Sequence, residues 1–178
     1  MYPWDGKNIY LVGFMATGKS KVGKEIAYFL GRPFFDTDDL VEELAGKRIS
    51  EIFAHEGENA FRDLESKVVK QISQSRECVV ALGGGAVLRQ ENWTLLASTG
   101  IIICLYADEQ TLLERIISKD HRPLMRSESK QDLLSKIRAL LDERQPLYDR
   151  ADYCFKSRQD VSAQTLAKQI FYHLQEEL

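Results

Sequence analysis

The chain has no apolar run long enough to cross a bilayer and no excess of basic residues. A membrane-spanning helix needs about 20 predominantly apolar residues, and no apolar run in the sequence approaches that length. The formal net charge is −3, which argues against a general nucleic-acid or membrane-surface binder, because such proteins present a basic face. We therefore predict no nucleic-acid partner and no membrane association. Anionic ligands must be held by a few local cations.

Cysteine is scarce, and its three copies lack the spacing of metal ligands or of a redox motif. Cys78, Cys104 and Cys154 lie in apolar stretches, and no two of them form C-x-x-C. We interpret them as buried free thiols in a reducing compartment. Residues 1–5 also lack the basic segment and apolar core that begin a signal peptide. The sequence therefore predicts a cytoplasmic protein.

A chain of 178 residues is long enough for one domain with a substantial core. No repeat, low-complexity tract or linker divides it. The predicted strands are residues 8–13, 33–36, 78–82, 100–106 and 152–156. Apolar residues at helical spacing predict helices that include residues 19–30, 61–72, 112–117, 133–141 and 166–174. This alternation predicts an α/β fold, a parallel sheet with helices on both faces.

The first predicted strand runs into Gly13-Phe14-Met15-Ala16-Thr17-Gly18-Lys19-Ser20, which has the P-loop spelling G-x-x-x-x-G-K-S. Its glycines let backbone amides curl around a polyphosphate, and the following helix N-terminus adds partial positive charge. We expect Lys19 to reach the β- and γ-phosphates and Ser20 to place its hydroxyl on Mg²⁺. The alternative is a plain strand-to-helix turn. The apolar strand before the motif and the helix after it favour a nucleotide site.

Acidic residues follow the second predicted strand, in the run Asp36-Thr37-Asp38-Asp39. Sites in open α/β sheets lie outside the carboxyl ends of the strands. Carboxylates placed there could help to hold magnesium and accept a substrate proton. The alternative is a helix N-cap followed by first-turn acids. We expect both, with Asp38 or Asp39 serving partly as the cap.

Three further features interrupt the regular pattern. Arg62 and Glu65 lie on one helix face, where a surface ion pair is the simpler interpretation. Glycines 83–85 follow the third predicted strand, and a backbone without side chains can touch a ligand directly. The polar segment 118–131 is either a disordered loop or a functional lid, and the phosphate site favours the lid.

Two arginines are candidate ligands for anionic groups. Arg122, in the predicted lid, could neutralise charge in the transition state of phosphoryl transfer. Arg144, near the end of a helix before Pro146, could clamp a carboxylate through two parallel hydrogen bonds. Both could equally be solvated surface arginines.

Together these motifs resemble the shikimate kinase family over almost the whole chain. The segments that carry the resemblance are GFMATGKS at 13–20, DTD at 36–38, FRDLE at 61–65, GGG at 83–85, RPL at 122–124 and RQPLY at 144–148. The resemblance implies a three-layer P-loop NTPase fold with a five-stranded parallel sheet in the order 2-3-1-4-5. It implies one kinase domain over residues 1–178, with a mobile lid at 118–131 and a substrate-binding helical segment at 37–65.

The implied reaction is ATP-dependent phosphorylation of the 3-hydroxyl of shikimate, with Mg²⁺, on the route to chorismate and the aromatic amino acids. The implied catalytic residues are Lys19, Asp38 as the candidate base, and Arg122. The implied nucleotide-binding residues are Ala16, Thr17, Gly18, Lys19, Ser20, Lys21, Arg115, Arg122 and Arg158. Shikimate would contact Asp38, Arg62, Gly84, Gly85 and Arg144, and Ser20 and Asp36 would hold the metal. We expect a monomer.

The chain departs from the family pattern at three places. Ala16 replaces a glycine that is usual in the P-loop, and Lys21 stands where threonine is common. The predicted adenine-side segment, 157–160, aligns poorly. Because Ala16 needs only an allowed backbone angle, we expect modest effects on nucleotide affinity and no loss of binding.

Two other functions fit part of the sequence. One is a different small P-loop kinase, such as a gluconate-type sugar-acid kinase. The pairing of Arg62 and Arg144 with the triple glycine argues against it. The other is a catalytically silent regulator that binds nucleotide. Such a protein would be expected to have lost Lys19, Asp38 or Arg62, and all three are present.

Overall fold

The structure is a computed structural model and describes residues 4–118 and 129–176. Its strands are β1 (Asn8–Val12), β2 (Phe34–Asp36), β3 (Val79–Ala81), β4 (Gly100–Tyr106) and β5 (Tyr153–Lys156). Its α-helices are α1 (Lys19–Leu30), α2 (Thr37–Ala45), α3 (Ile49–His55), α4 (Gly57–Ile72), α5 (Gln90–Thr99), α6 (Glu109–Ile117), α7 (Lys130–Tyr148) and α8 (Ala163–Glu176). A short 3₁₀ helix, η1, spans Ala86–Leu88.

The strands form one parallel sheet in the order β2-β3-β1-β4-β5. The central strand, β1, pairs Leu11 with Ala81 of β3 on one side and with Ile103 of β4 on the other. In the neighbouring pair, β2 and β3, Asp36 of β2 lies opposite Ala81 of β3. The predicted fold class and strand order are therefore confirmed. Because parallel strands end at a common edge, the segments that follow β1, β2 and β3 lie close together.

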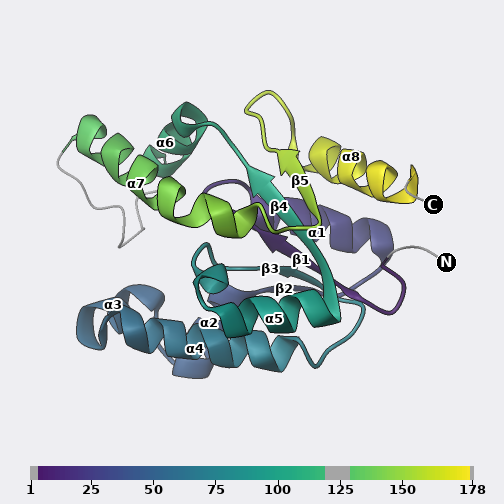
Figure 1. Cartoon of the computed structure of the whole chain (residues 1–178), viewed down its shortest axis with the longest axis horizontal. Coiled ribbons are helices and arrows are strands. Elements are labelled where there is room, and N and C mark those ends of the chain that lie inside the picture. The colour runs from purple at the N-terminus through teal and green to yellow at the C-terminus, as the bar shows by residue number, and fades with distance from the viewer. Residues whose placement is uncertain (1–3, 119–128, 177–178) are drawn as a thin grey trace.

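Helices cover both faces of the sheet and form three layers with it (Figure 1). Alternate residues of β1 divide the core, because successive side chains of a strand point to opposite faces. Ile9 and Leu11 pack in an apolar cluster with residues of α1 and α8. Tyr10 and Val12 pack in a second cluster, to which α4, α5, α6 and α7 contribute. This arrangement leaves the carboxyl edge of the sheet for a site.

A third apolar cluster lies outside the sheet and joins α2, α3 and α4. Its buried members are Val41, Ile52, Phe61 and Val68. The predicted substrate-binding segment, 37–65, therefore folds as α2, α3 and the first part of α4. No helix within residues 4–118 and 129–176 has the length and apolar composition needed to cross a membrane.

Two predicted helix ends are corrected. The helix of Arg144 does not stop before Pro146, because α7 continues to Tyr148. A proline this close to a C-terminal end removes only one backbone hydrogen bond of the helix. The cap of α2 is Asp36 and not Asp38 or Asp39, because β2 passes directly into the helix. The Asp36 carboxylate accepts a 3.0 Å hydrogen bond from the Asp38 amide.

The prediction of three buried thiols is wrong for one of them. Cys78 and Cys104 are buried, whereas Cys154 is exposed, and all three are free. The reason lies in β5, which is an edge strand of the sheet. Its alternate residues Cys154 and Lys156 are exposed, while Tyr153 and Phe155 are half-buried against the core.

Candidate active site

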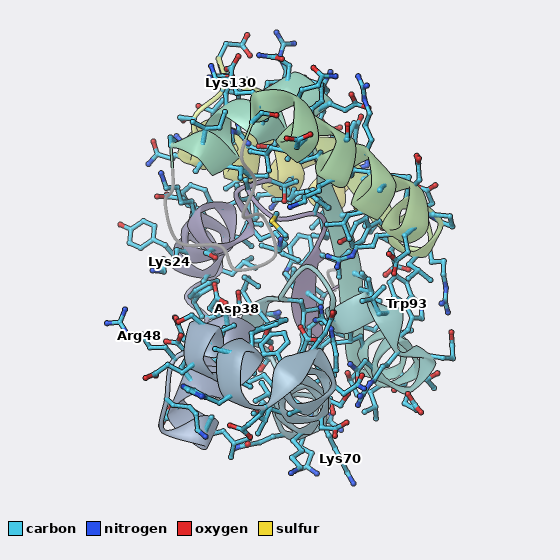
Figure 2. The ribbon with its side chains drawn as sticks, turned by 90° about the vertical axis from the view of Figure 1, so that its left-hand side faces the viewer. Lys24, Asp38, Arg48, Lys70, Trp93 and Lys130 are labelled. Carbon is cyan, nitrogen blue, oxygen red and sulfur yellow. The ribbon has the colours of Figure 1, made fainter. Side chains whose placement is uncertain are left out.

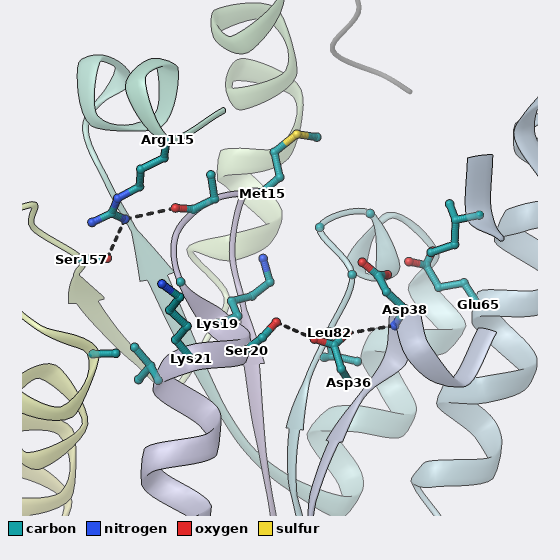
Figure 3. Close-up of a pocket in the computed structure, with 18 of the residues that line it drawn as sticks. Met15, Lys19, Ser20, Lys21, Asp36, Asp38, Glu65, Leu82, Arg115 and Ser157 are labelled. Atoms are coloured by element: carbon teal, nitrogen blue, oxygen red, sulfur yellow. Dashed lines mark hydrogen bonds between the residues drawn. The ribbon is translucent and has the colours of Figure 1, made fainter. Parts of the chain in front are cut away.

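A cleft of about 1080 Å³ opens at the carboxyl edge of the sheet (Figure 3). It is lined by the P-loop after β1, the acids after β2 and the glycine turn after β3, together with side chains from α4, α6 and α7. The predicted site residues that line it are Ala16, Gly18, Lys19, Ser20, Lys21, Asp36, Asp38, Arg62, Gly84, Gly85, Arg115 and Arg144. Segments that were singled out separately in the sequence thus form one site.

The P-loop holds its own lysine in the ligand-free structure. Lys19 Nζ donates hydrogen bonds to the carbonyl oxygens of Gly13, at 2.9 Å, and Phe14, at 3.0 Å. Helix α1 begins at Lys19 without a side-chain cap, so its first amides are available to an anion. The loop therefore offers amides and an ammonium group to phosphate oxygens, and the ammonium group can exchange carbonyl partners for phosphate.

Ala16 has a φ angle of 64°. This left-handed conformation costs an L-residue about 1–2 kcal/mol, which explains why glycine suits the position. The Ala16 carbonyl oxygen accepts a 3.1 Å hydrogen bond from Arg115 Nη1. Arg115 also donates to Ser157 Oγ at 2.9 Å (Figure 3) and to the Arg158 carbonyl at 3.0 Å. Arg115 thus ties the P-loop to the predicted adenine-side segment.

Three predicted nucleotide-binding residues are not among the described residues that line the cleft, although Thr17 belongs to the P-loop and is predicted to contact phosphate through its backbone amide. Thr17 is fully buried and donates its hydroxyl to the Phe14 carbonyl at 2.8 Å. The exposed side chain of Arg158 pairs with Asp160 at 2.7 Å. Arg122 and most of the predicted lid, residues 119–128, lie outside the described residues.

Ser20 and Asp36 lie together where the sequence predicts a metal. Ser20 Oγ donates a 2.5 Å hydrogen bond to Asp36 Oδ2 (Figure 3). Oxygen donors are what Mg²⁺ prefers, and it is usually held by one or two carboxylates together with substrate phosphates. The described residues contain no group of three or more His, Cys, Asp or Glu side chains that could hold a metal. The hydroxyl and carboxylate therefore fit a Mg²⁺ that arrives with the nucleotide.

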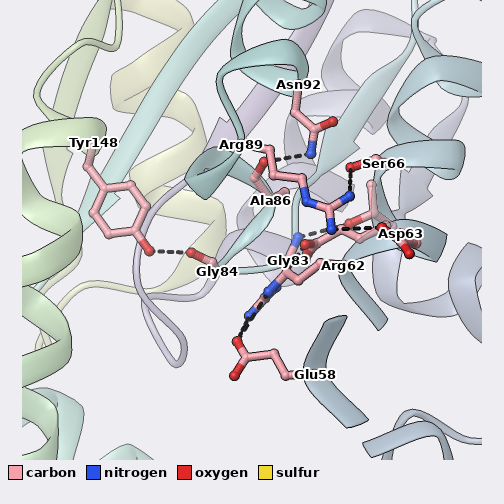
Figure 4. Close-up of polar contacts among 12 residues, drawn as sticks. Glu58, Arg62, Asp63, Ser66, Gly83, Gly84, Ala86, Arg89, Asn92 and Tyr148 are labelled. Carbon is pink, nitrogen blue, oxygen red and sulfur yellow. Dashed lines mark hydrogen bonds and ion pairs between the residues drawn. The ribbon is translucent and has the colours of Figure 1, made fainter. Parts of the chain in front are cut away.

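The ion pair of Arg62 is buried, so the surface interpretation is wrong. Arg62 is 7% exposed and Glu65 is 1% exposed. Arg62 bonds Glu65 at 2.7 Å and Glu58 at 3.0 Å (Figure 4). Burial by itself lowers the pKa of Arg62, but the two carboxylates outweigh burial and raise its pKa above the ordinary value. Burial also raises the pKa of Glu65, against the effect of the arginine.

Arg144 is a buried cation of a different kind. It is 3% exposed, so the solvated-surface alternative is wrong for this residue. Among the described residues it forms no ion pair at close range, although its charge lowers the pKa of Glu65, and its Nε has no hydrogen-bond partner. A buried charge that is not paired at close range is unfavourable. The arrangement favours an anion supplied by a ligand, and a planar carboxylate matches the guanidinium fork.

The glycine turn is required by close approach of side chains. A Cβ atom at Gly83 would lie 2.7 Å from both Asp38 Oδ1 and Glu65 Oε1. A Cβ atom at Gly85 would overlap the guanidinium of Arg62. These glycines therefore let acids and a cation converge on one turn.

Several residues of the cleft have no sequence pattern that marks them as functional. Glu65 was seen only as the partner of Arg62, yet its Oε1 is buried without a hydrogen-bond partner. Phe53, Phe61 and Leu82 give the cleft apolar walls. In the sequence, their spacing within helices and strands indicates only that they belong to the core. Arg48 also lines the cleft, and Figure 2 shows its side chain directed away from the body of the protein.

The fold and the cleft define a small P-loop kinase, with a phosphate-binding loop facing a pocket of acids and buried arginines. The model of the shikimate kinase family matches residues 15–175. The chain belongs to the shikimate kinase family.

Individual relatives agree with this assignment. A shikimate kinase of Thermodesulfovibrio yellowstonii is 45% identical over 148 residues, which cover 83% of this chain and 84% of the relative. One from Synechococcus sp. (strain JA-3-3Ab) is 42% identical over 168 residues, covering 93% and 86%.

Solved structures give the same result. A shikimate kinase from Acinetobacter baumannii, in complex with shikimate, is 36% identical with a TM-score of 0.92, covering 98% of this chain and 96% of that one. A gluconokinase from Sinorhizobium meliloti 1021 shares the fold, at 18% identity and a TM-score of 0.55, covering 97% of each chain.

Proposed function

We propose that this kinase transfers the terminal phosphoryl group of ATP to the 3-hydroxyl of shikimate, giving shikimate 3-phosphate and ADP on the route to the aromatic amino acids. The observation that carries this proposal is Arg144, a buried guanidinium without a carboxylate partner among the described residues. It lies beside the glycine turn, 3.6 Å from a Cβ position at Gly84. A small acceptor with one carboxylate and several hydroxyls fits this environment.

We call the part of the cleft that binds shikimate the acceptor side. Its arginines and its acid have different roles. Arg144 and Arg62 bind the carboxylate of shikimate, and backbone groups of Gly84 and Gly85 contact the ring substituents. Asp38 engages the reacting hydroxyl and accepts its proton. Its carboxylate lies at the turn, because a Cβ atom at Gly83 would meet Asp38 Oδ1 at 2.7 Å. Phosphoryl transfer depends mostly on such positioning and on electrostatic stabilisation.

The donor side binds the nucleotide. The loop amides from Ala16 onward hold phosphates, and Lys19 leaves its loop carbonyls to bind the β- and γ-phosphates. Lys21 lines the cleft and adds a second ammonium group where family members commonly have threonine. Ser20 and Asp36 hold Mg²⁺, which neutralises phosphate charge when it is bound. Arg115 flanks the adenine, and Arg122 keeps its predicted role at the transferring group.

We further propose that the enzyme acts as a monomer in the cytoplasm. The described part of one chain brings the P-loop, the acids and the buried arginines into one cleft, which supports the proposal of a monomer. The free thiols of Cys78 and Cys104 agree with a reducing compartment.

A coupled assay of ADP formation tests the proposed function. Purified protein with ATP and Mg²⁺ is expected to form ADP only when shikimate is added, and not with gluconate at the same concentration. Removal of Mg²⁺ by a chelator should abolish turnover. Folded protein that turns over gluconate, or that shows no dependence on shikimate, would refute the proposal.

A further inference from the structure

Two buried hydroxyl groups bind the glycine turn from different elements. The amide of Gly83 donates a 2.8 Å hydrogen bond to Thr37 Oγ1. The hydroxyl of Tyr148 donates a 2.5 Å hydrogen bond to the Gly84 carbonyl oxygen (Figure 4). Thr37 is 0% and Tyr148 is 2% exposed, so both hydroxyls are shielded from water, whereas Gly83 and Gly84 are half-buried and line the cleft. We call these two side chains and their bonds the hydroxyl clamp.

Thr37 connects the turn to the catalytic acid. It is the first residue of α2 and stands between Asp36, the helix cap, and Asp38. Its β-branched side chain has few rotamers, so the bond to Gly83 fixes the backbone of the acids relative to the turn. The Asp38 carboxylate packs so closely on Gly83 that no Cβ atom fits there. A shift of the turn would therefore displace the carboxylate.

Tyr148 connects the turn to the buried cation. It follows Arg144 by one turn of α7, and the positive charge of Arg144 acts on its hydroxyl, lowering the Tyr148 pKa against the effect of burial. Burial raises the pKa of Tyr148 to about 12, so its hydroxyl keeps its proton at neutral pH. Because a peptide unit is planar and trans, holding the Gly84 carbonyl also sets the direction of the Gly85 amide.

We propose that Thr37 and Tyr148 are positioning residues, which hold Asp38, the turn and Arg144 in the geometry that the acceptor requires. The inference rests on the proposed function, because it assigns the clamp to the shikimate side of the cleft. The Thr37 bond sets the alignment of the reacting hydroxyl, and the Tyr148 bond sets the carboxylate pocket. The bonds of both hydroxyls are made to the glycine turn and not to the P-loop.

The two bonds predict different kinetic effects. Removing the hydrogen-bond partner of a shielded backbone group changes an equilibrium constant or a rate constant by roughly 5- to 150-fold. Thr37→Val keeps the shape but removes the acceptor, and should lower kcat for shikimate about tenfold or more with little change in KM. Tyr148→Phe should raise the KM for shikimate about tenfold or more with a smaller change in kcat. The ATP dissociation constant should change less than about twofold in both.

Matched variants separate positioning from general stability. Thr37→Ser keeps a hydroxyl and should restore most of the activity that Thr37→Val loses. Tyr10→Phe and Thr99→Val each remove one member of a part-buried hydroxyl pair that is bonded at 2.8 Å and does not line the cleft. We expect them to lower the melting temperature as the clamp variants do, with kcat and KM for shikimate unchanged.

The outcomes distinguish the clamp from the proposed function. Wild-type protein that does not phosphorylate shikimate would refute the proposed function itself. Wild-type turnover with unaltered kinetics in Thr37→Val and Tyr148→Phe would overturn the clamp alone. The clamp is also overturned if Tyr10→Phe or Thr99→Val causes the same kinetic loss, or if Thr37→Ser is as impaired as Thr37→Val.

Discussion

The two sides of the cleft are organised differently. On the acceptor side the charged residues Arg62, Glu65 and Arg144 are buried, at most 7% exposed, whereas Asp38 is exposed. On the donor side Ser20 and Lys21 are exposed, and Lys19 is bonded to carbonyls of its own loop. Buried polar groups cannot rearrange without losing partners, whereas exposed groups can exchange them. We infer that the acceptor pocket exists before ligands bind and that the donor side adjusts to the nucleotide.

The largest expected effect concerns the buried ion pair of the acceptor side. Arg62→Ala leaves Glu65 buried without its cation, which should lower the free energy of unfolding by about 3–5 kcal/mol. The control is Arg89→Ala, whose pair with Asp63 is partly exposed and should contribute about 1 kcal/mol or less. Urea unfolding of both variants checks the prediction. Equal losses of unfolding free energy in the two variants would show that burial does not increase the contribution of the ion pair to stability.

Asp38→Asn tests the proposed catalytic base. It should lower kcat by about 10²-fold or more, the usual contribution of a positioned base, and leave ATP binding intact. Asp39→Asn changes the next residue of the same helix, which does not line the cleft, and should keep normal turnover. Near-normal kcat in Asp38→Asn would remove this residue from the mechanism.

Arg144→Ala should affect the ligand more than the fold. The loss of a charged hydrogen bond should weaken shikimate binding by about 1.5–3 kcal/mol. Because Arg144 forms no close ion pair among the described residues and acts on Glu65 only through its charge, whereas Arg62 is bonded to Glu65 directly, stability should change less than in Arg62→Ala. The control Arg138→Ala removes an exposed arginine of α7 that is paired with Glu109. An unchanged KM for shikimate in Arg144→Ala would contradict the assigned role.

The smallest effect is expected on the donor side. Ala16→Gly relieves a left-handed φ of 64° but makes the unfolded chain more flexible. The net gain in unfolding free energy should be no more than about 1 kcal/mol. Ala27→Gly, in the buried interior of α1, should instead destabilise by about 1 kcal/mol. A loss in Ala16→Gly as large as that in Ala27→Gly would show that Ala16 is not strained.

Much of the fold could be predicted because the apolar pattern and the turn residues agree. The strand positions were right to within two residues, and α1 begins and ends where the sequence predicts. Helix α5 was not predicted, and α3 was predicted only as an undivided part of the helical segment 37–65, because few apolar residues in each are buried. Ile52 alone is buried in α3, and Trp93 and Leu96 are the buried apolar residues of α5. So narrow an apolar stripe gives a weak periodic signal.

The site was predicted less completely, because spacing identifies residue types but not burial. The pattern that pairs Arg62 with Glu65 is the same for an exposed and a buried pair. The hydrogen bond between Tyr148 and Gly84 joins residues that are 64 positions apart in the sequence, so no local sequence pattern predicts it. Thr37 lay inside a recognised motif, yet only the fold places its hydroxyl against the turn.

The most direct test of a preformed acceptor pocket is calorimetric titration of shikimate into nucleotide-free protein, with Arg144→Ala in parallel. We predict saturable binding to the wild-type protein without nucleotide, and binding at least about tenfold weaker in the variant. Gluconate should not bind at comparable concentrations. Binding of shikimate that appears only after a non-hydrolysable ATP analogue is added would contradict the account, because the acceptor side would then depend on the donor side for its form.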